Sequence, residues 1–231
     1  MNALVTGPLV ATETRLPELT DMLWQAALET LWMVALTITV GGALGMLLGL
    51  ALYATRPGGL YGNKVVNGLL NLLVNFFRPI PFVIFIAAVQ PLARVVVGIG
   101  IGNKAVVFAL VLAAMFGISR LVEQNLVTVD PGVVEAARSM GASRPRILFS
   151  VVVPEAMGPL ILGYTFAFVA IVDMSAIAGV IGGGGLGAFA QNYGYLQFDT
   201  VVTWTAVVAI VVIVQAGQML GNLAARRVLR R

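Results

Sequence analysis

Residues 130–154 read DPGVVEAARSMGASRPRILFSVVVP, and they interrupt a chain that is elsewhere apolar enough to lie in lipid. Asp130 can accept hydrogen bonds from the free N–H groups at the start of a helix, and Pro131 suits the first helical position. Gly141 suits the left-handed residue that ends a helix. The stretch therefore predicts a short helix held between two membrane segments.

A rotation of about 100° per residue divides this short helix into two faces. The apolar face holds Val133, Val134, Ala136, Ala137 and Met140. The polar face holds Glu135, Arg138 and Ser139. Ser143 offers a second helix cap just beyond it. The helix is either an ordinary connection that rests on protein or lipid headgroups, or a surface that docks a partner.

The order of residues in this stretch resembles the "EAA" loop of bacterial ABC-importer permeases. In that family the loop is a cytoplasmic coupling helix, which docks on an ATPase subunit and transmits its motion to the membrane helices. The matching positions are Glu135, Ala136, Ala137 and Gly141, followed by the apolar run 147–154. The resemblance implies that the ATPase-coupling residues are Val133, Glu135, Ala136, Ala137, Met140 and Gly141. Val133, Ala137 and Met140 are expected to form the docking face.

Composition identifies an integral membrane protein. Of 231 residues, 59% are hydrophobic and 10% charged, against about 45–50% and about 25% in soluble proteins. The chain has no Cys and no His, which excludes disulfides, thiolate metal sites and imidazole chemistry. We therefore expect no catalytic, cofactor or metal site. The net charge of +4 does not indicate nucleic-acid binding, because the basic residues cluster at membrane boundaries.

Five segments are long and apolar enough to span a membrane, which takes about 20 residues each. They are residues 24–53, 65–89, 105–127, 147–177 and 201–223. The expected fold is all-α, with five transmembrane helices and a cytoplasmic coupling helix. Residues 1–22 form a polar extracytoplasmic segment and not a cleavable signal. Residues 23–225 form the transmembrane domain, with the coupling loop at 128–146, and residues 226–231 form a basic cytoplasmic tail.

Proline and glycine mark the irregular points of these segments. The run Arg78-Pro79-Ile80-Pro81 should break the second segment, residues 91–103 should form a loop, and Pro154 and Pro159 should bend the fourth segment. Gly41, Gly45 and Gly49 allow close approach of another helix, within the subunit or at a dimer seam. Residues 179–187, GVIGGGGLG, lack the Lys-Ser or Lys-Thr of a phosphate loop, so we expect a tight connection there.

Arg78 and Asp173 fall inside predicted spans and are candidates for a translocation pathway. Arg78 either fixes a helix end near the cytoplasmic surface or faces a polar cavity. We take Asp173 as the only acidic residue inside a predicted span. It either faces a substrate cavity, pairs with Arg78, or lies at an aqueous edge. Met174 and Ser175 beside it complete the candidate set. The resembling family has a Gly-Tyr pair where this chain has Asp173-Met174.

Charge distribution predicts the orientation. With the coupling stretch in the cytoplasm, ten basic residues lie inside: Arg56, Lys64, Arg120, Arg138, Arg144, Arg146, Arg226, Arg227, Arg230 and Arg231. Three lie outside: Arg15, Arg94 and Lys104. Because basic residues concentrate on the cytoplasmic side, we expect the N-terminus outside and the C-terminus inside.

Residues 182–195, GGGGLGAFAQNYGY, resemble methionine ABC-importer permeases of the MetI type. The resemblance implies a type I ABC-importer permease fold and a homodimer in the bacterial inner membrane that carries methionine, its D-isomer or related amino acids. It also implies two cytoplasmic ATPase subunits (MetN type), which hold ATP and Mg²⁺, and an extracytoplasmic binding protein (MetQ type). The chain itself is then not an enzyme. The alternative is an ion-coupled secondary transporter or channel for a small polar solute, for which only Asp173 is a plausible relay.

Overall fold

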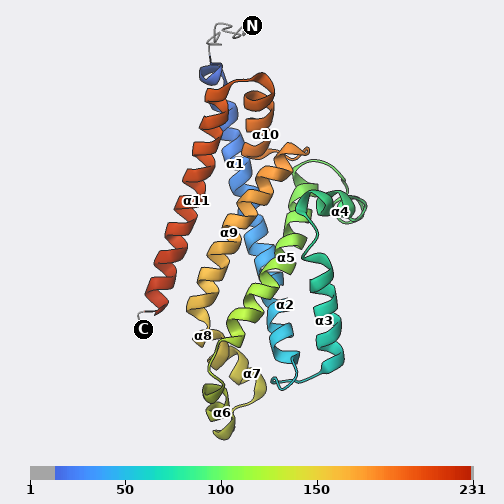
Figure 1. The fold of residues 1–231 in the computed structure, drawn as a ribbon, viewed down its shortest axis with the longest axis vertical. Coiled ribbons are helices and arrows are strands. Elements are labelled where there is room, and N and C mark those ends of the chain that lie inside the picture. The colour runs from blue at the N-terminus through green and yellow to red at the C-terminus, as the bar shows by residue number, and fades with distance from the viewer. Residues whose placement is uncertain (1–13, 230–231) are drawn as a thin grey trace, which may run out of the picture.

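The computed structural model describes residues 14–229, and within that range the chain is helical and without strands (Figure 1). It begins with the 3-10 turn η1 (Leu16–Leu19), α1 (Thr20–Leu36), the π-helical turn η2 (Thr37–Gly41) and α2 (Gly42–Thr55). Together these make one apolar run of 40 residues, longer than the predicted segment 24–53. Residues 20–22, expected in the polar N-terminal segment, are the first turn of α1. Residues 1–13 of that segment lie outside the described range.

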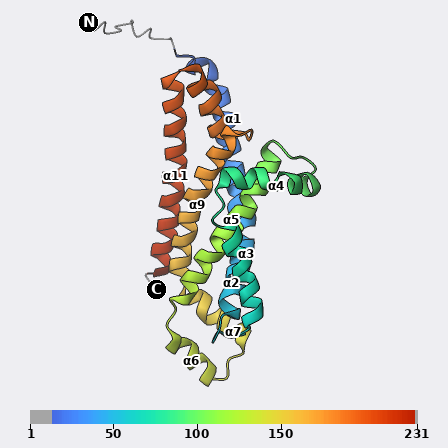
Figure 2. The same cartoon turned by 45° about the vertical axis from the view of Figure 1, so that its right-hand side comes forward.

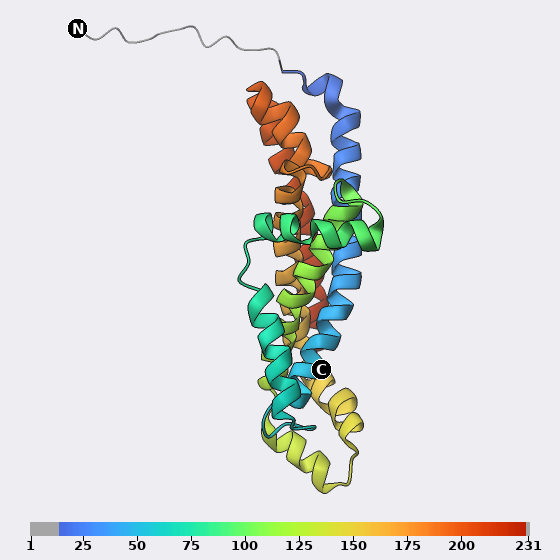
Figure 3. The same cartoon turned by 90° about the vertical axis from the view of Figure 1, so that its right-hand side faces the viewer.

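The second predicted segment is broken in the middle, as its two prolines predict. α3 (Lys64–Phe77) and α4 (Phe82–Val97) meet at an angle of 113°, and Figure 3 shows α4 lying across the bundle. The expected loop 91–103 is shorter than predicted and covers residues 98–102, because α4 continues through Pro91 to Val97. Gly98 follows as its C-cap, with a φ of +83°. Within residues 14–229, four helical runs can cross a membrane, and this bent pair makes a fifth if it counts as one span.

The centre of the bundle is α5 (Asn103–Val127), which packs against α2. Glycines allow that close approach. Gly41, Gly45 and Gly49, which we call the glycine stripe, could face either another helix of the same subunit or a second subunit, and their contacts decide between the two. A β-carbon at Gly41 would lie 3.0 Å from the carbonyl oxygen of Val111, and one at Gly49 would lie 2.6 Å from that of Ser119. The stripe therefore packs within the subunit.

The fourth predicted segment is also interrupted. After the coupling loop come α7 (Arg144–Ile147), the π-helical turn η3 (Leu148–Val152), α8 (Val153–Glu155) and then α9 (Met157–Val180). A break between α8 and α9 falls at Ala156, two residues after Pro154, whereas Pro159 lies within α9.

The last part of the chain forms a hairpin and a long outer helix. α10 (Gly185–Phe189), the π-helical turn η4 (Ala190–Gly194) and the 3-10 turn η5 (Tyr195–Gln197) lie at the opposite end of the bundle from the coupling loop (Figure 1). α11 (Thr200–Leu229) then runs back along α9. It extends beyond the predicted end at residue 223 and carries Arg226 and Arg227 of the basic tail, whereas residues 230–231 lie outside the described range.

Candidate functional site

The coupling stretch folds as its local signals predict. It forms α6 (Pro131–Ser139), which projects from one end of the bundle (Figure 2). Asp130 Oδ1 accepts a hydrogen bond from Gly132 N at 2.8 Å, and Gly141 is left-handed, with a φ of +77°. Ser143 precedes α7 in extended backbone, but its side chain makes no capping hydrogen bond, so that part of the prediction is wrong.

The side chains of α6 divide differently from the predicted docking face. Met140 is 80% exposed and Val133 is 38% exposed, whereas Ala137 is only 4% exposed. Ala137 belongs to the same buried cluster as Ile147 and Leu148 of this chain. The prediction that Ala137 forms part of the docking face is therefore wrong for its side chain. Helical periodicity identifies an apolar face, but it cannot say which part of that face the chain itself covers.

The exposed surface of the coupling helix includes three apolar residues on one side and a carboxylate beside them. Val133, Ala136 and Met140 are exposed, and so is Glu135. The backbone carbonyl of Glu135 accepts a hydrogen bond from Ser139 Oγ at 3.1 Å. We call the exposed group Val133, Ala136 and Met140 the free face of α6.

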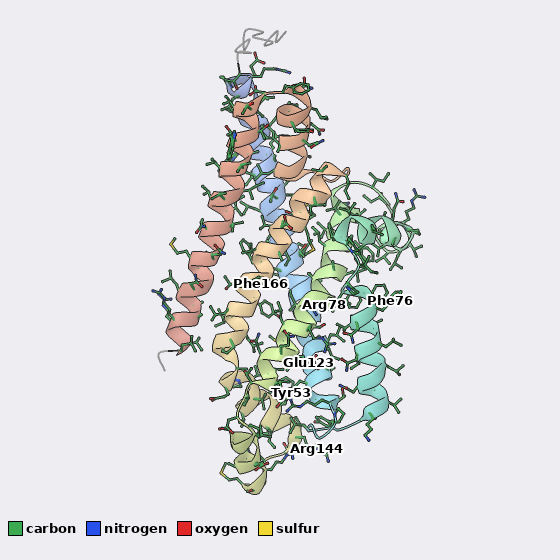
Figure 4. The ribbon with its side chains drawn as sticks, viewed as in Figure 1. Tyr53, Phe76, Arg78, Glu123, Arg144 and Phe166 are labelled. Atoms are coloured by element: carbon green, nitrogen blue, oxygen red, sulfur yellow. The ribbon has the colours of Figure 1, made fainter. Side chains whose placement is uncertain are left out.

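The turn between α2 and α3 supports the coupling loop from the side. The Arg144 guanidinium lies over the Tyr61 ring at 5.6 Å, and that of Arg56 lies over the Tyr53 ring at 4.4 Å. Figure 4 shows Tyr53 and Arg144 at the end of the molecule that carries α6. Cation–π contacts of this kind fix the planes of long basic side chains. The loop is thus tied to the bundle at two points, here and at Ala137.

A polar network joins α3 to α5, and sequence analysis missed it. Arg120 pairs with Glu123, and both side chains are largely buried, at 16% and 14% exposed. Arg120 Nη2 also donates to Asn71 Oδ1 at 3.0 Å and to Asn75 Oδ1 at 2.6 Å. The signal in the sequence was the spacing of four residues between Asn67, Asn71 and Asn75, which places them on one helical face.

The two charged pathway candidates are both exposed, and they do not pair. Arg78 lies at the end of α3, beside the break (Figure 4). Asp173 lies inside the apolar span of α9, seven residues before its end, which is about 10 Å along the axis. Within residues 14–229 the ion pairs are Arg15–Glu18 and Arg120–Glu123. The interpretation of Asp173 as a partner for Arg78 within the subunit is therefore wrong.

The two residues that follow Asp173 are covered by the protein itself. Ser175 is 2% exposed, and its hydroxyl donates to the carbonyl of Val172 at 2.7 Å. Met174 is half-buried and packs against two core clusters. Ser175 is buried in this structure, so its place in the pathway stays a prediction, and of the three only Asp173 is exposed.

A set of three side chains holds the glycine-rich connection before α10. Glu29 Oε2 accepts from Gly185 N at 2.7 Å, Thr30 Oγ1 from Leu186 N at 2.9 Å, and Asn103 Oδ1 from Gly184 N at 2.6 Å. We call Glu29, Thr30 and Asn103 the loop clasp. The statement that Asp173 is the only acidic residue in a predicted span is wrong, because Glu29, Glu123 and Glu155 also lie within predicted spans.

Comparison with known proteins identifies the family to which this architecture belongs. A family model described as binding-protein-dependent transport system inner membrane component matches residues 41–231. The probable D-methionine transport system permease protein MetI of Vibrio cholerae is 39% identical over 208 residues, 90% of this chain and 92% of that protein. The methionine import system permease protein MetP of Bacillus subtilis is 41% identical over 201 residues, 87% of this chain and 90% of that protein.

Solved structures agree with this assignment. A chain of the inward-facing MetNI methionine ABC transporter superposes with a TM-score of 0.88 at 34% identity, covering 91% of this chain and 98% of that one. A chain of an amino acid ABC transporter shares the fold, with a TM-score of 0.77 at 20% identity and coverage of 92% and 96%. The chain therefore belongs to the family of binding-protein-dependent transport system inner membrane components, and it is a multi-pass protein of the inner membrane.

Proposed function

We propose that this chain is the transmembrane subunit of an ABC importer that carries methionine, D-methionine or related amino acids into the cell. The observation that carries the proposal is α6, a capped helix that projects from the bundle and offers an apolar free face. The relatives named for methionine transport, 39% and 41% identical over most of the chain, support the substrate class.

ATP is hydrolysed on a separate pair of ATPase subunits, which hold the nucleotide and Mg²⁺. The glycine-rich loop of this chain lacks the Lys-Ser or Lys-Thr that a phosphate loop requires. Each ATPase subunit docks on the free face of one α6, with Glu135 at its edge. Gly141 shapes the end of the docking helix, and Ala137 fixes the helix to the bundle.

The packing of the coupling loop gives motion of the ATPase a direct path into the membrane. Ala137 shares a buried cluster with Ile147, Leu148 and Val152, and the same cluster continues to Ile171 on α9. Closely packed cores transmit displacement because they contain few voids that could absorb it. Movement of α6 against a second subunit therefore shifts α9, and with it the surface that carries Asp173.

The remaining partners follow from the orientation. α6 and the basic tail lie in the cytoplasm, and the polar N-terminal segment lies outside. The α10 hairpin is at the outer end of the bundle, where an extracytoplasmic binding protein delivers the substrate. Two copies of the chain form the transmembrane unit, residues 23–225 of each being its membrane domain.

Purification of the protein from its native membrane in mild detergent, followed by mass spectrometry, tests the proposal. A stoichiometric cytosolic ATPase is expected with the wild type and with Met22→Glu, an exposed residue at the opposite end of the molecule. Met140→Glu should lose that ATPase, because it places a charge on the free face. Recovery of the wild-type permease alone, with uptake that follows an ion gradient instead of ATP, would favour the ion-coupled transporter.

A further inference from the structure

The exposed face of α9 has a regular spacing. Leu162 is 44% exposed, Phe166 68% and Val180 51%, and Asp173 is exposed between the last two. At about 100° per residue these four positions fall within an arc of about 40°. Phe166, Asp173 and Val180 are each seven residues apart, which is the spacing with which one helix packs against another. Figure 4 shows Phe166 at mid-height on α9.

A carboxylate in this face cannot be left against lipid. No hydrogen bond or ion pair to the Asp173 side chain is formed by any residue in the range 14–229. Charged groups within the hydrocarbon layer are costly, and they almost always face a protein interior or a water-filled path. Lipid would cover the apolar residues on either side equally well, so it is the carboxylate among them that favours protein as the cover. The occupant that fits is a second copy of this chain.

Two copies related by a two-fold axis would bring two such faces together, each with one carboxylate in an otherwise apolar surface. An isologous contact uses the same surface of both subunits, so Asp173 of each copy would lie in the shared contact. Two carboxylates without basic partners form an acidic point on the path between the subunits. That point attracts a cation, and the cation common to all amino acids is the α-ammonium group.

We propose that Asp173 recognises the α-ammonium group of the amino-acid substrate on its path between two copies of the chain. The inference rests on the proposed function, and it assigns a chemical role to one residue of the pathway. The ammonium donates charge-assisted hydrogen bonds to the carboxylate oxygens, which are stronger than bonds between neutral groups.

Equilibrium binding to the purified permease–ATPase complex tests the contact as a thermodynamic cycle. The probes are radiolabelled methionine and 4-(methylsulfanyl)butanoate, the same molecule without its amino group. Asp173→Asn should weaken methionine binding by about tenfold or more, because a hydrogen bond to a charged group contributes about 1.5–3 kcal/mol. Removing the amino group should cost a similar factor in the wild type and little in Asp173→Asn, because the two changes remove the same interaction.

Two further variants complete the test. Asp173→Glu should restore most of the binding, and Glu155→Gln, an exposed carboxylate at the other end of the same segment, should bind like the wild type. Equal losses for both probes in Asp173→Asn would overturn the proposal and indicate a role in subunit packing. Wild-type binding that is undetectable, or unchanged in Asp173→Asn, would also overturn it.

Uptake into proteoliposomes separates this inference from the proposed function. ATP-driven methionine uptake by the wild type supports the importer whatever the cycle shows. If that uptake is absent in the complete complex with ATPase and binding protein, the proposed function fails. Co-purification of the ATPase with Asp173→Asn at the wild-type stoichiometry shows that the variant complex is assembled.

Discussion

Gly141 has a role that is conformational and not steric. Its φ is +77°, and an added β-carbon would meet nothing within 4 Å. Gly141→Val should therefore cost about 1–2 kcal/mol of backbone strain and reduce uptake by disturbing the end of the coupling helix. Gly141→Asn is the matched control, because Asn tolerates the left-handed region. Normal uptake by the Val variant at wild-type protein levels would contradict the assignment.

The role of Gly49 is steric and not conformational, because neighbouring atoms leave no room for a side chain. A β-carbon there would lie 2.6 Å from both the Ser119 carbonyl oxygen and the Val122 β-carbon, whereas one at Gly68 of α3 would meet nothing within 4 Å. Gly49→Ala should destabilise the protein by about 1–3 kcal/mol through overpacking, and Gly68→Ala should be neutral or slightly stabilising. Thermal unfolding in detergent distinguishes the two, and equal midpoints would argue against the α2–α5 packing.

At the scale of elements, the loop clasp fixes the start of α10 to α1 and α5. Glu29→Ala leaves Gly185 N without its acceptor, which costs about 1–3 kcal/mol. Glu29→Gln keeps an amide oxygen in the same place and should recover most of that loss. Hydrogen exchange at the Gly185 amide is the direct measurement. Protection that is unchanged in Glu29→Ala would show that the clasp does not hold the loop.

The start of α11 is tied to the N-terminal segment by Asp199. Its carboxylate accepts from Val202 N at 3.1 Å and from Arg15 N at 3.0 Å. Burial alone would raise the pKa of Asp199, but hydrogen bonds from Val202, Arg15, Thr14 and Val201 together hold that pKa below its usual value. The resulting stability is therefore present above the unfolded pKa of about 3.9, and it is lost as the pH falls through the lowered folded value.

Asp199→Asn should remove this acid dependence. Between about pH 5 and about pH 3 the melting temperature of the wild type should fall further than that of the variant. At neutral pH, Asp199→Ala should cost about 1 kcal/mol, as is usual for a lost helix cap. Parallel pH profiles for wild type and Asp199→Asn would contradict the role of the carboxylate.

At the scale of the whole molecule, the coupling loop is both attached to the bundle and open to a partner, and two variants separate these roles. Ala137→Asp buries a carboxylate without a partner, so it should destabilise the protein by at least about 2 kcal/mol. Met140→Glu changes a residue that is 80% exposed, so it should leave thermal stability unchanged while it abolishes association with the ATPase. A stable Ala137→Asp protein that still loses the ATPase would return Ala137 to the docking face.

The membrane segments and the coupling helix were determined by the sequence itself. A spanning helix satisfies its backbone hydrogen bonds internally, so a run of apolar residues is enough to predict it. The helix signals at Asp130, Pro131 and Gly141 act over a few residues, and the broken span at residues 78–81 follows from proline geometry alone. These features were therefore predicted correctly without knowledge of the fold.

Only the tertiary structure decided which residues face one another. Glu29 meets Gly185 across 156 positions, and Arg120 meets Asn71 across 49. Ala137 is covered because the coupling loop folds back onto η3. Asp173 is left uncovered because no helix within residues 14–229 packs over that face. Hydropathy and capping depend on near neighbours in sequence, whereas these contacts depend on how distant helices dock, which no local pattern encodes.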